Sequence, residues 1–285
     1  MIKFKTTKID ELNIFYLEAG NPEKHSILLL HGFPSSSYMY RNLIKNLKDE
    51  YHLIAPDYPG FGHSSFPSKM DFDYTFDRLA EVIEKFCQKI GLTSFSPFVH
   101  DYGAPIGFRI AESNPEWIKT LLIQNGNAYK EGIGPGFDPI RKMWDDRNEE
   151  TEQNVLDLLT LDITRWQHKE GASKPETISP DGYKMDQLFM DRPGNKQIQL
   201  ELLHDYRNNL KKYAKWHSFF KNHQPPALIV WGRNDEFFPE AGAIAYKQDL
   251  NNVELHMLDS GHFPLEEYAD VTALFIRKFL TYHLR

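Results

Sequence analysis

The stretch Val99-His100-Asp101-Tyr102-Gly103-Ala104 decides the fold of this chain, because it joins an apolar run to a helix-like segment through a sharp turn. Residues 95–99 are apolar enough for a buried strand, and residues 105–113 are typical of a helix. A strand, a sharp turn and a helix form the geometry of a nucleophile elbow, which exposes one side chain at the turn. A carboxylate there, such as Asp101, can attack an sp3 carbon and form an ester that water later cleaves.

An aspartate at the first turn of a helix also has an ordinary structural explanation, because its side chain can cap the helix. The chemical interpretation of Asp101 gains support from the rest of the chain, which contains no Gly-x-Ser-x-Gly motif. The aspartate therefore stands where a serine hydrolase would carry its serine.

Composition excludes several other classes of protein. The 285 residues include 33 Lys and Arg against 40 Asp and Glu, a formal net charge of −7, so we expect no nucleic-acid partner. Cys87 is the one cysteine, which excludes an internal disulfide and fits a reducing compartment. We find no signal peptide and no apolar window long enough to span a membrane, and we expect a cytoplasmic protein with no membrane partner. The oligomeric state stays open.

Apolar runs alternate with helical patterns over most of the chain, which predicts an α/β fold with a mostly parallel central sheet flanked by helices. Strands are expected at residues 2–9, 12–18, 26–30, 51–55, 95–100, 118–124, 226–231 and 253–258. Helices are expected at residues 38–47, 76–90, 105–113, 239–250 and 265–283. Residues 127–222 differ, with helical stretches rich in Trp, Tyr and charge, so we expect an inserted helical cap on a core of residues 1–126 and 223–285.

Further motifs follow the predicted strands, at the edge where open parallel sheets carry their sites. Phe33, in the turn His31-Gly32-Phe33-Pro34, can direct its backbone amide at an oxyanion, and the amide of Tyr102 is a second such donor. Asp235 follows the strand at 226–231 and can orient a histidine. His262 follows the last strand, so these side chains occur in the chain order nucleophile, acid, histidine.

These motifs resemble the α/β-hydrolase fold family over both core segments, roughly two thirds of the chain. Within that family, the elbow His100-Asp101-Tyr102-Gly103 is similar to that of epoxide hydrolases, haloalkane dehalogenases and fluoroacetate dehalogenases. The resemblance implies Asp101 as the nucleophile, His262 as the base that activates water and Asp235 as the partner of that base.

The resemblance also implies that Phe33 and Tyr102 contribute their backbone amides to an oxyanion hole, and that the cap closes the pocket. Some relatives carry the acid after the strand that here ends near residue 124. In this chain Asn125 and Asn127 occupy that region, and an amide cannot supply the charge. Asp235 is therefore the better acid.

Epoxide opening produces an alkoxide that needs a proton, and relatives supply it from cap tyrosines. The run Tyr206-Arg207-Asn208 resembles that of epoxide hydrolase caps, although Tyr206 is equally explained as a packed aromatic of an amphipathic helix. A second tyrosine expected in the first cap helix is missing, and Trp144 lies in its region. Tyr129 and Tyr183 are candidate substitutes, and His168 is a candidate for the same proton transfer.

Haloalkane dehalogenases hold the leaving halide with ring or amide N–H donors, commonly a tryptophan next to the nucleophile. Tyr102 has that position here, and Trp144, Trp166 or Asn125 are candidate replacements. Fluoroacetate dehalogenases need arginines close behind the nucleophile, and the residues following Tyr102 include none in reach.

We therefore expect a hydrolase that forms a covalent ester on Asp101, with epoxide hydrolysis to a diol as the first expectation and haloalkane hydrolysis as the alternative. Its partners are a small, hydrophobic to polar organic substrate and water. We expect no metal and no cofactor, because no His/Cys cluster or dinucleotide loop is evident. A cofactor-free oxygenase or a non-catalytic binding protein of the same fold is a further alternative, since fold alone never settles function.

Overall fold

The computed structural model describes residues 1–284 and places eight strands in one sheet, in the order β1-β2-β4-β3-β5-β6-β7-β8. The strands are β1 (Ile2–Ile9), β2 (Leu12–Ala19), β3 (Ser26–Leu30), β4 (His52–Pro56), β5 (Phe95–His100), β6 (Leu121–Gln124), β7 (Ala227–Gly232) and β8 (Val253–Leu258). β2 is antiparallel to β1 and β4, and every pairing from β4 to β8 in the sheet order is parallel. The expected α/β class with a mostly parallel sheet is confirmed.

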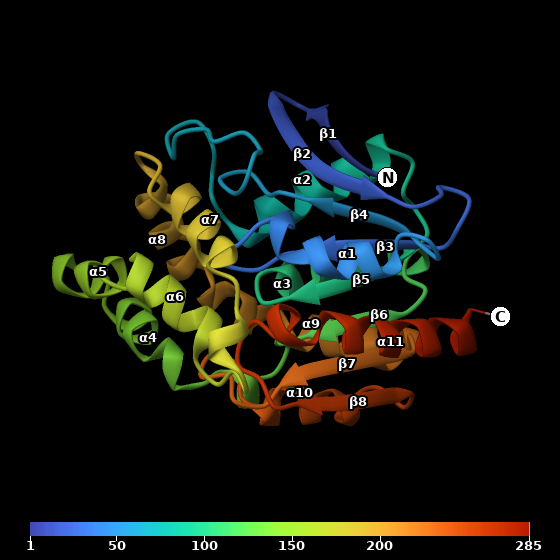
Figure 1. Cartoon of the computed structure of the whole chain (residues 1–285). Helices are drawn as coiled ribbons and strands as arrows, with labels where there is room; N and C mark the ends of the chain where they lie inside the picture. The colour runs from blue at the N-terminus through green and yellow to red at the C-terminus, as the bar shows by residue number, and fades with distance from the viewer. Residues whose placement is uncertain (285) are drawn as a thin grey trace.

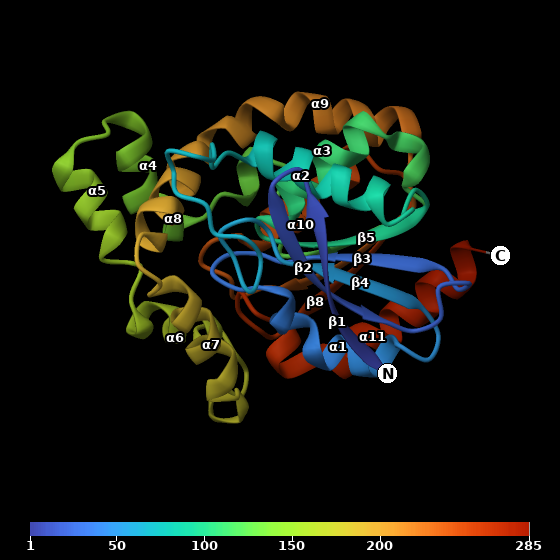
Figure 2. The ribbon, with the colours of Figure 1, turned by 90° about the horizontal axis from the view of Figure 1, so that it is seen from above.

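Helices cover both faces of the sheet (Figure 2). One face carries α1 (Arg41–Leu47) and α11 (Leu265–His283), and the other carries α2 (Phe76–Lys89), α3 (Gly103–Ser113), α9 (Arg207–His223) and α10 (Glu240–Ala245). Because the central strands are buried on both sides, they need apolar residues without alternation, as in β3. The apolar side chains form two core clusters, one on each face.

A group of helices extends beyond the carboxyl ends of β3, β5 and β7 (Figure 1). These helices are α4 (Asp138–Asp145), α5 (Glu149–Leu156), α6 (Leu161–Lys169), α7 (Pro180–Met190) and α8 (Asn195–Asp205). The segment expected to form the cap also includes α9, which lies against the core instead. The ring of Phe108 on α3 contacts Trp216 and Phe220 of α9 at centroid distances of 5.5 and 5.2 Å.

Three predicted elements are shortened or divided in the structure. The strand expected at 118–124 begins at Leu121, because Ile118 pairs with Phe95 only through an isolated bridge. The helices expected at 38–47 and 239–250 are each divided into an α-helix and a 3-10 turn. The 3-10 helices are Ser37–Tyr40, Pro115–Trp117, Lys130–Gly132, Pro135–Phe137, Pro175–Thr177 and Tyr246–Gln248.

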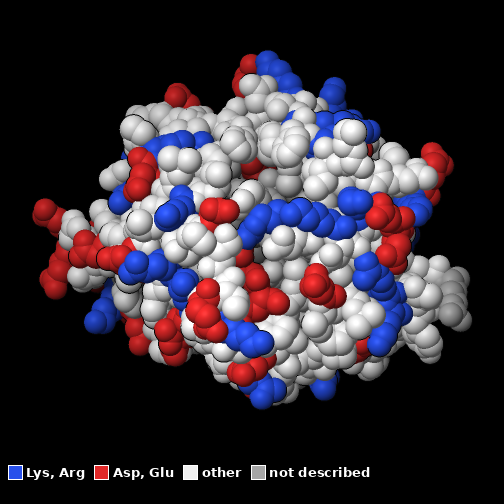
Figure 3. Space-filling view, in the orientation of Figure 1, with Lys and Arg blue, Asp and Glu red and all other residues white. Residues whose placement is uncertain are grey.

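Acidic and basic side chains are mixed over the face that carries α1 and α11, with acidic groups gathered at the end of the cap near α5 (Figure 3). This distribution agrees with the small negative net charge. Among residues 1–284, every helix is too short or too polar to cross a membrane.

Candidate active site

Asp101 lies in the turn between β5 and α3 and is 4% exposed. Its φ of 47° is in the left-handed region, which residues other than glycine rarely adopt and which occurs at strained functional turns. Two glycines permit this geometry. A Cβ on Gly103 would collide with the carbonyl oxygen of Leu30, and a Cβ on Gly32 would collide with the side chain of Asp101. The motif therefore forms the elbow that the sequence predicts.

Two backbone N–H groups face the carboxylate of Asp101. The N–H of Phe33 donates to Oδ2 at 2.8 Å, and the N–H of Tyr102 also stabilises the charged form. Burial raises the pKa of Asp101 to about 7, although His262 and the two N–H groups act in the opposite direction. The two donors point to the position where negative charge would develop if the carboxyl carbon of Asp101 were attacked.

His262 follows β8 and Asp235 follows β7, so parallel strands bring both to the same edge of the sheet. Nδ1 of His262 donates to Oδ2 of Asp235 at 2.8 Å, and its Nε2 lies 3.9 Å from Oδ2 of Asp101. Burial lowers the pKa of His262, but Asp235 and Asp101 outweigh burial and the net shift is upward. The structure thus brings together the nucleophile, base and acid expected from the sequence.

Asp235 is held by two further groups. Nδ2 of Asn125 donates to its Oδ2 at 2.8 Å, and the N–H of Phe237 donates to its Oδ1 at 2.8 Å. Oδ1 of Asn125 accepts from the N–H of Gly232 at 2.9 Å, which orients the amide. Both ends of the Asn125 amide are used to hold Asp235 and its loop, and Asn125 is not among the residues that line the cavity described below.

A cavity of about 350 Å³ opens above these groups. Phe33, Asp101, Tyr102 and His262 form its floor, and the cap forms most of the wall. The apolar wall residues include Phe137, Ile140, Leu159, Ile163, Leu203, Phe237 and Phe238. A wall of this kind binds the apolar body of a small molecule and leaves orientation to a few polar groups.

The cap residues expected to assist the leaving group lie in different places. Trp166 lines the cavity. Trp144 and His168 are absent from its wall, which corrects their expected contact with substrate. Nε1 of Trp144 donates to a backbone carbonyl of α8 at 2.8 Å, and His168 is hydrogen-bonded to Asp186 at 2.8 Å. Their polar groups are therefore used inside the protein.

Tyr206 lies behind the wall of the cavity and does not form part of it. Its ring centroid is 6.1 Å from that of Tyr102 and 5.0 Å from that of Phe137, and its hydroxyl is hydrogen-bonded to that of Tyr213. Burial, then Tyr213, then the charge of Asp101 raise the pKa of Tyr206. The structure therefore places Tyr206 next to the cavity wall and not in it, and the charge of Asp101 still acts on its hydroxyl.

Gln167 is a cavity residue that the sequence did not predict. Its side chain is 5% exposed and lines the cavity, and its amide has no hydrogen-bond partner among residues 1–284. Nε1 of Trp166 is likewise without a partner in this part of the chain. A glutamine in a polar cap helix carries no signal of its own, and only its position next to Trp166 points toward the cavity.

Comparisons with known proteins agree with this geometry. The model of the α/β-hydrolase fold family matches residues 25–269. An uncharacterized hydrolase of Saccharomyces cerevisiae is 37% identical over 91% of this chain and 90% of its own length. A cis-3-alkyl-4-alkyloxetan-2-one decarboxylase of Xanthomonas campestris pv. campestris is 34% identical over 93% of this chain and 91% of its own length. A haloalkane dehalogenase of Mycolicibacterium paratuberculosis is 37% identical over 116 residues, which are 40% of this chain and 38% of that protein.

Solved structures show the same fold over the whole chain. The epoxide hydrolase CorEH has a TM-score of 0.80 at 21% identity, with all of both chains covered. A mutant haloalkane dehalogenase from Agrobacterium tumefaciens has a TM-score of 0.83 at 20% identity, covering 98% of this chain and 97% of that one. Sheet order, elbow, paired histidine and family match all agree: the chain belongs to the α/β-hydrolase fold family.

Proposed function

We propose that this protein is a hydrolase that acts through an ester on Asp101, and that its substrate is a small apolar epoxide. One observation carries the reaction type. The buried carboxylate of Asp101 faces two backbone N–H donors and the pair His262–Asp235 at the floor of an apolar cavity. This arrangement supplies a nucleophile, an oxyanion site and a base oriented by an acid.

In the first half-reaction Oδ1 of Asp101 attacks a ring carbon of the epoxide, while Oδ2 stays bonded to the N–H of Phe33. A C–O bond forms between enzyme and substrate, the ring C–O bond breaks, and the ring oxygen leaves as an alkoxide that takes up a proton. The product is a neutral ester with a hydroxyl on the neighbouring carbon. No charge then remains on Asp101.

In the second half-reaction water attacks the carbonyl carbon of the ester, and Nε2 of His262 takes its proton. The N–H groups of Phe33 and Tyr102 stabilise the oxyanion. Collapse of the oxyanion releases the diol, with the proton of His262 passing to the departing oxygen. The charge of Asp101 is one cause of the raised pKa of His262, so forming the neutral ester favours the unprotonated base when it is needed.

A strained oxygen ring is the electrophile best supported. The relative named for decarboxylation of an oxetan-2-one, a four-membered oxygen ring, resembles this chain over 93% of its length. The matches to haloalkane dehalogenases of Mycolicibacterium paratuberculosis, Psychrobacter cryohalolentis and Mycobacterium marinum span 116, 148 and 121 residues, too few to include the cap together with both halves of the core. An epoxide is the three-membered counterpart, and attack relieves its strain. We assign the proton transfer to Tyr206, through a shift of its hydroxyl from Tyr213 toward the cavity.

Haloalkane hydrolysis is the second candidate, and a specific observation favours it. Trp166 and Gln167 line the cavity, and neither side chain has a hydrogen-bond partner within residues 1–284. A leaving halide needs N–H donors of the kind that an indole and an amide supply. The two candidates share Asp101, His262 and Asp235 and differ only in the group that receives the leaving atom.

The variant His262→Gln tests the covalent step. Ester formation does not need the base but ester hydrolysis does, so this variant should be alkylated on Asp101 and then stall. Mass spectrometry of the intact protein should show one substrate mass added after mixing with an epoxide. Normal turnover of the variant without an adduct would remove His262 from the mechanism.

Matched variants separate the two candidates. Loss of the hydroxyl in Tyr206→Phe should slow diol formation from an epoxide roughly a hundredfold and leave halide release from a haloalkane little changed. If halide hydrolysis is the activity, Trp166→Phe should slow halide release from a haloalkane and leave diol formation from an epoxide little changed. Equal rates of wild type and Tyr206→Phe on epoxides would exclude Tyr206 and favour the dehalogenase assignment.

A further inference from the structure

His168 and Asp186 form a buried pair that the proposed mechanism does not use. Nε2 of His168, on α6, donates to Oδ2 of Asp186, on α7, at 2.8 Å, and each side chain is 1% exposed. Nδ1 of His168 and Oδ1 of Asp186 have no hydrogen-bond partner within residues 1–284, although the charge of Asp186 acts on Arg41 and helps to raise its pKa. Burying such groups is costly unless the fold gains something from them, so the pair calls for a role.

We propose that His168, held in place by Asp186, is a positioning residue that fixes His262 through the ring of Phe263. The inference rests on the proposed function, because it concerns the half-reaction in which His262 acts as a base. It makes the cap a determinant of ester hydrolysis as well as of substrate binding.

The aromatic contacts form a continuous path from the cap to the base. The ring of His168 is stacked on that of Phe263, with centroids 4.0 Å apart and planes at 10°. Phe263 in turn meets His262 edge-on, at 4.9 Å and 90°. On the core side, His100 lies 5.4 Å from Phe263 and 4.9 Å from His262. The ring of Phe263 therefore contacts His100 of the core and His168 of the cap, and His262 packs edge-on against it.

The backbone after α6 contacts both loops that carry the catalytic pair. Side-chain Nδ2 of Asn234, next to Asp235, donates to the carbonyl oxygen of Gly171 at 2.9 Å. Gly261, next to His262, lies so close to Glu170 that a Cβ on it would collide with the carbonyl oxygen of that residue. The end of α6 thus rests directly on the loops whose geometry sets the base.

α7 also packs closely against the core. A Cβ on Gly182 of α7 would lie 3.1 Å from Oε1 of Glu266 and 3.2 Å from Cε1 of His168. Glu266 lies in the first turn of α11, directly after the His262 loop, and is paired with Arg41 by contacts of 3.0 and 2.6 Å. Movement of the helix pair α6–α7 would therefore disturb the segment that carries the base.

The inference predicts a selective kinetic defect. His168→Ala should slow hydrolysis of the ester roughly tenfold to a hundredfold, because small displacements of a catalytic group have effects of that size. Formation of the ester should stay within about twofold of wild type, because Asp101 attacks without the base. The ester should therefore accumulate in rapid-quench mass spectrometry.

Two further variants keep the test independent of folding. His168→Phe retains a ring against Phe263 and should recover most of the hydrolysis rate, whereas Asp186→Asn should show a smaller defect of the same kind as His168→Ala. The matched control is Thr164→Val. Thr164 links the same two helices through a 2.7 Å hydrogen bond to Gln187 and makes no hydrogen bond to the His262 loop within residues 1–284, so its loss should leave the ratio of the two steps unchanged.

Equal slowing of both steps in His168→Ala, or the same defect in Thr164→Val, would overturn the positioning role. Unchanged hydrolysis in a folded His168→Ala and in Asp186→Asn would do the same. The variant His262→Gln separates this failure from failure of the proposed function. If it accumulates ester and the His168 variants do not, only the positioning role is wrong; if it accumulates none, the covalent mechanism itself is wrong.

Discussion

At the scale of single residues, Asp101 combines two features that a structural aspartate would avoid. Its backbone is in the left-handed region, and its carboxylate is buried with a pKa raised to about 7. Neither feature improves packing. Both features hold a weakly solvated carboxylate at the cavity, so we attribute them to a catalytic role that lowers the stability of the fold.

Asp101→Asn is therefore expected to be inactive but more stable than wild type above pH 7. The folded-state pKa of Asp101 is raised above the unfolded value of about 3.9, so the wild type loses stability as pH rises from about 4 to 7. The amide cannot ionise and tolerates the same backbone geometry. At 1.36 kcal/mol per pKa unit the gain is at most about 4 kcal/mol. Urea unfolding at pH 5 and pH 8 measures the difference in free energy of unfolding between Asp101→Asn and wild type. If this difference is no larger at pH 8 than at pH 5, ionisation of Asp101 is not its cause.

The sequence predicted some residues of the site and not others for a physical reason. Asp101, Asp235 and His262 each follow a strand within a local motif, and parallel strands bring such positions to one edge whatever the details of packing. Trp144, Asn125 and Gln167 depend on which distant group meets their side chain. No local pattern determines which group that is. Trp144 and Asn125 were therefore assigned to the cavity, which they do not line, and Gln167, which does line it, was missed.

At the scale of elements, all eight strands were predicted because runs suited to buried strands are a strong local signal. The packing of α9 against the core was not predicted. Its aromatic residues suggest a cap helix, but Trp216 and Phe220 pack on Phe108 of α3. The amphipathic pattern predicts the helix and its buried face, whereas the surface that covers this face is more than a hundred residues away in the chain.

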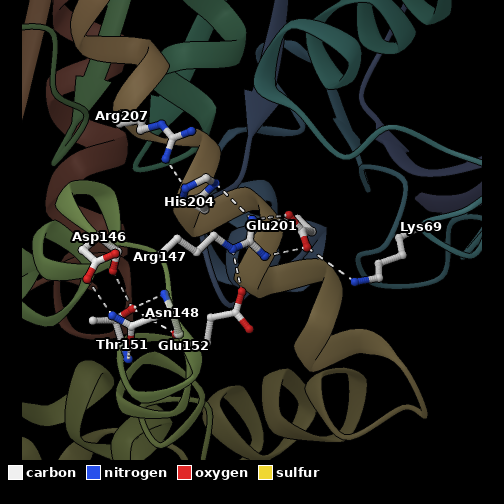
Figure 4. Close-up of polar contacts among 9 residues, drawn as sticks. All are labelled: Lys69, Asp146, Arg147, Asn148, Thr151, Glu152, Glu201, His204 and Arg207. Atoms are coloured by element: carbon white, nitrogen blue, oxygen red, sulfur yellow. Dashed lines mark hydrogen bonds and ion pairs between the residues drawn. The ribbon is translucent and has the colours of Figure 1, made fainter.

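The cap is braced by a charged network around Arg147 (Figure 4). Arg147 lies between α4 and α5, and its guanidinium donates to both carboxylate oxygens of Glu201 on α8 at 2.8 Å and to Glu152 on α5 at 2.6 Å. Nζ of Lys69, from a core loop, lies 3.5 Å from Glu201. A paired, partly buried arginine of this kind contributes more than an isolated surface ion pair.

Arg147→Gln should loosen the cap without disturbing the core. We expect a loss of roughly 1 kcal/mol in the free energy that protects α5 and α8 from local opening. Hydrogen exchange measured by mass spectrometry should be faster than in wild type in α5 and α8 and unchanged in the central strands. Arg165→Gln is the control, because Arg165 pairs with Asp162, an exposed carboxylate one turn away on the same helix, α6. Identical exchange in both variants would mean that the network does not brace the cap.

At the scale of the whole molecule, the sheet edge supplies the reacting groups and the cap supplies the space around them. The order of motifs along the chain predicted the first part. The second part depends on how α4 to α8 pack, which determines the apolar cavity and the access of Trp166 and Gln167 to it. The proposed reaction type therefore depends on local sequence motifs, whereas the proposed substrate depends on how the cap packs.

A single turnover in heavy-oxygen water tests the central claim most directly. In the proposed mechanism water attacks the carbonyl carbon of the ester, so the oxygen delivered to product comes from Asp101 and is replaced there by an oxygen from water. With enzyme in excess over substrate, we expect heavy oxygen in the peptide that contains Asp101 and an unlabelled first product. Heavy oxygen in the product, with Asp101 unlabelled, would contradict it.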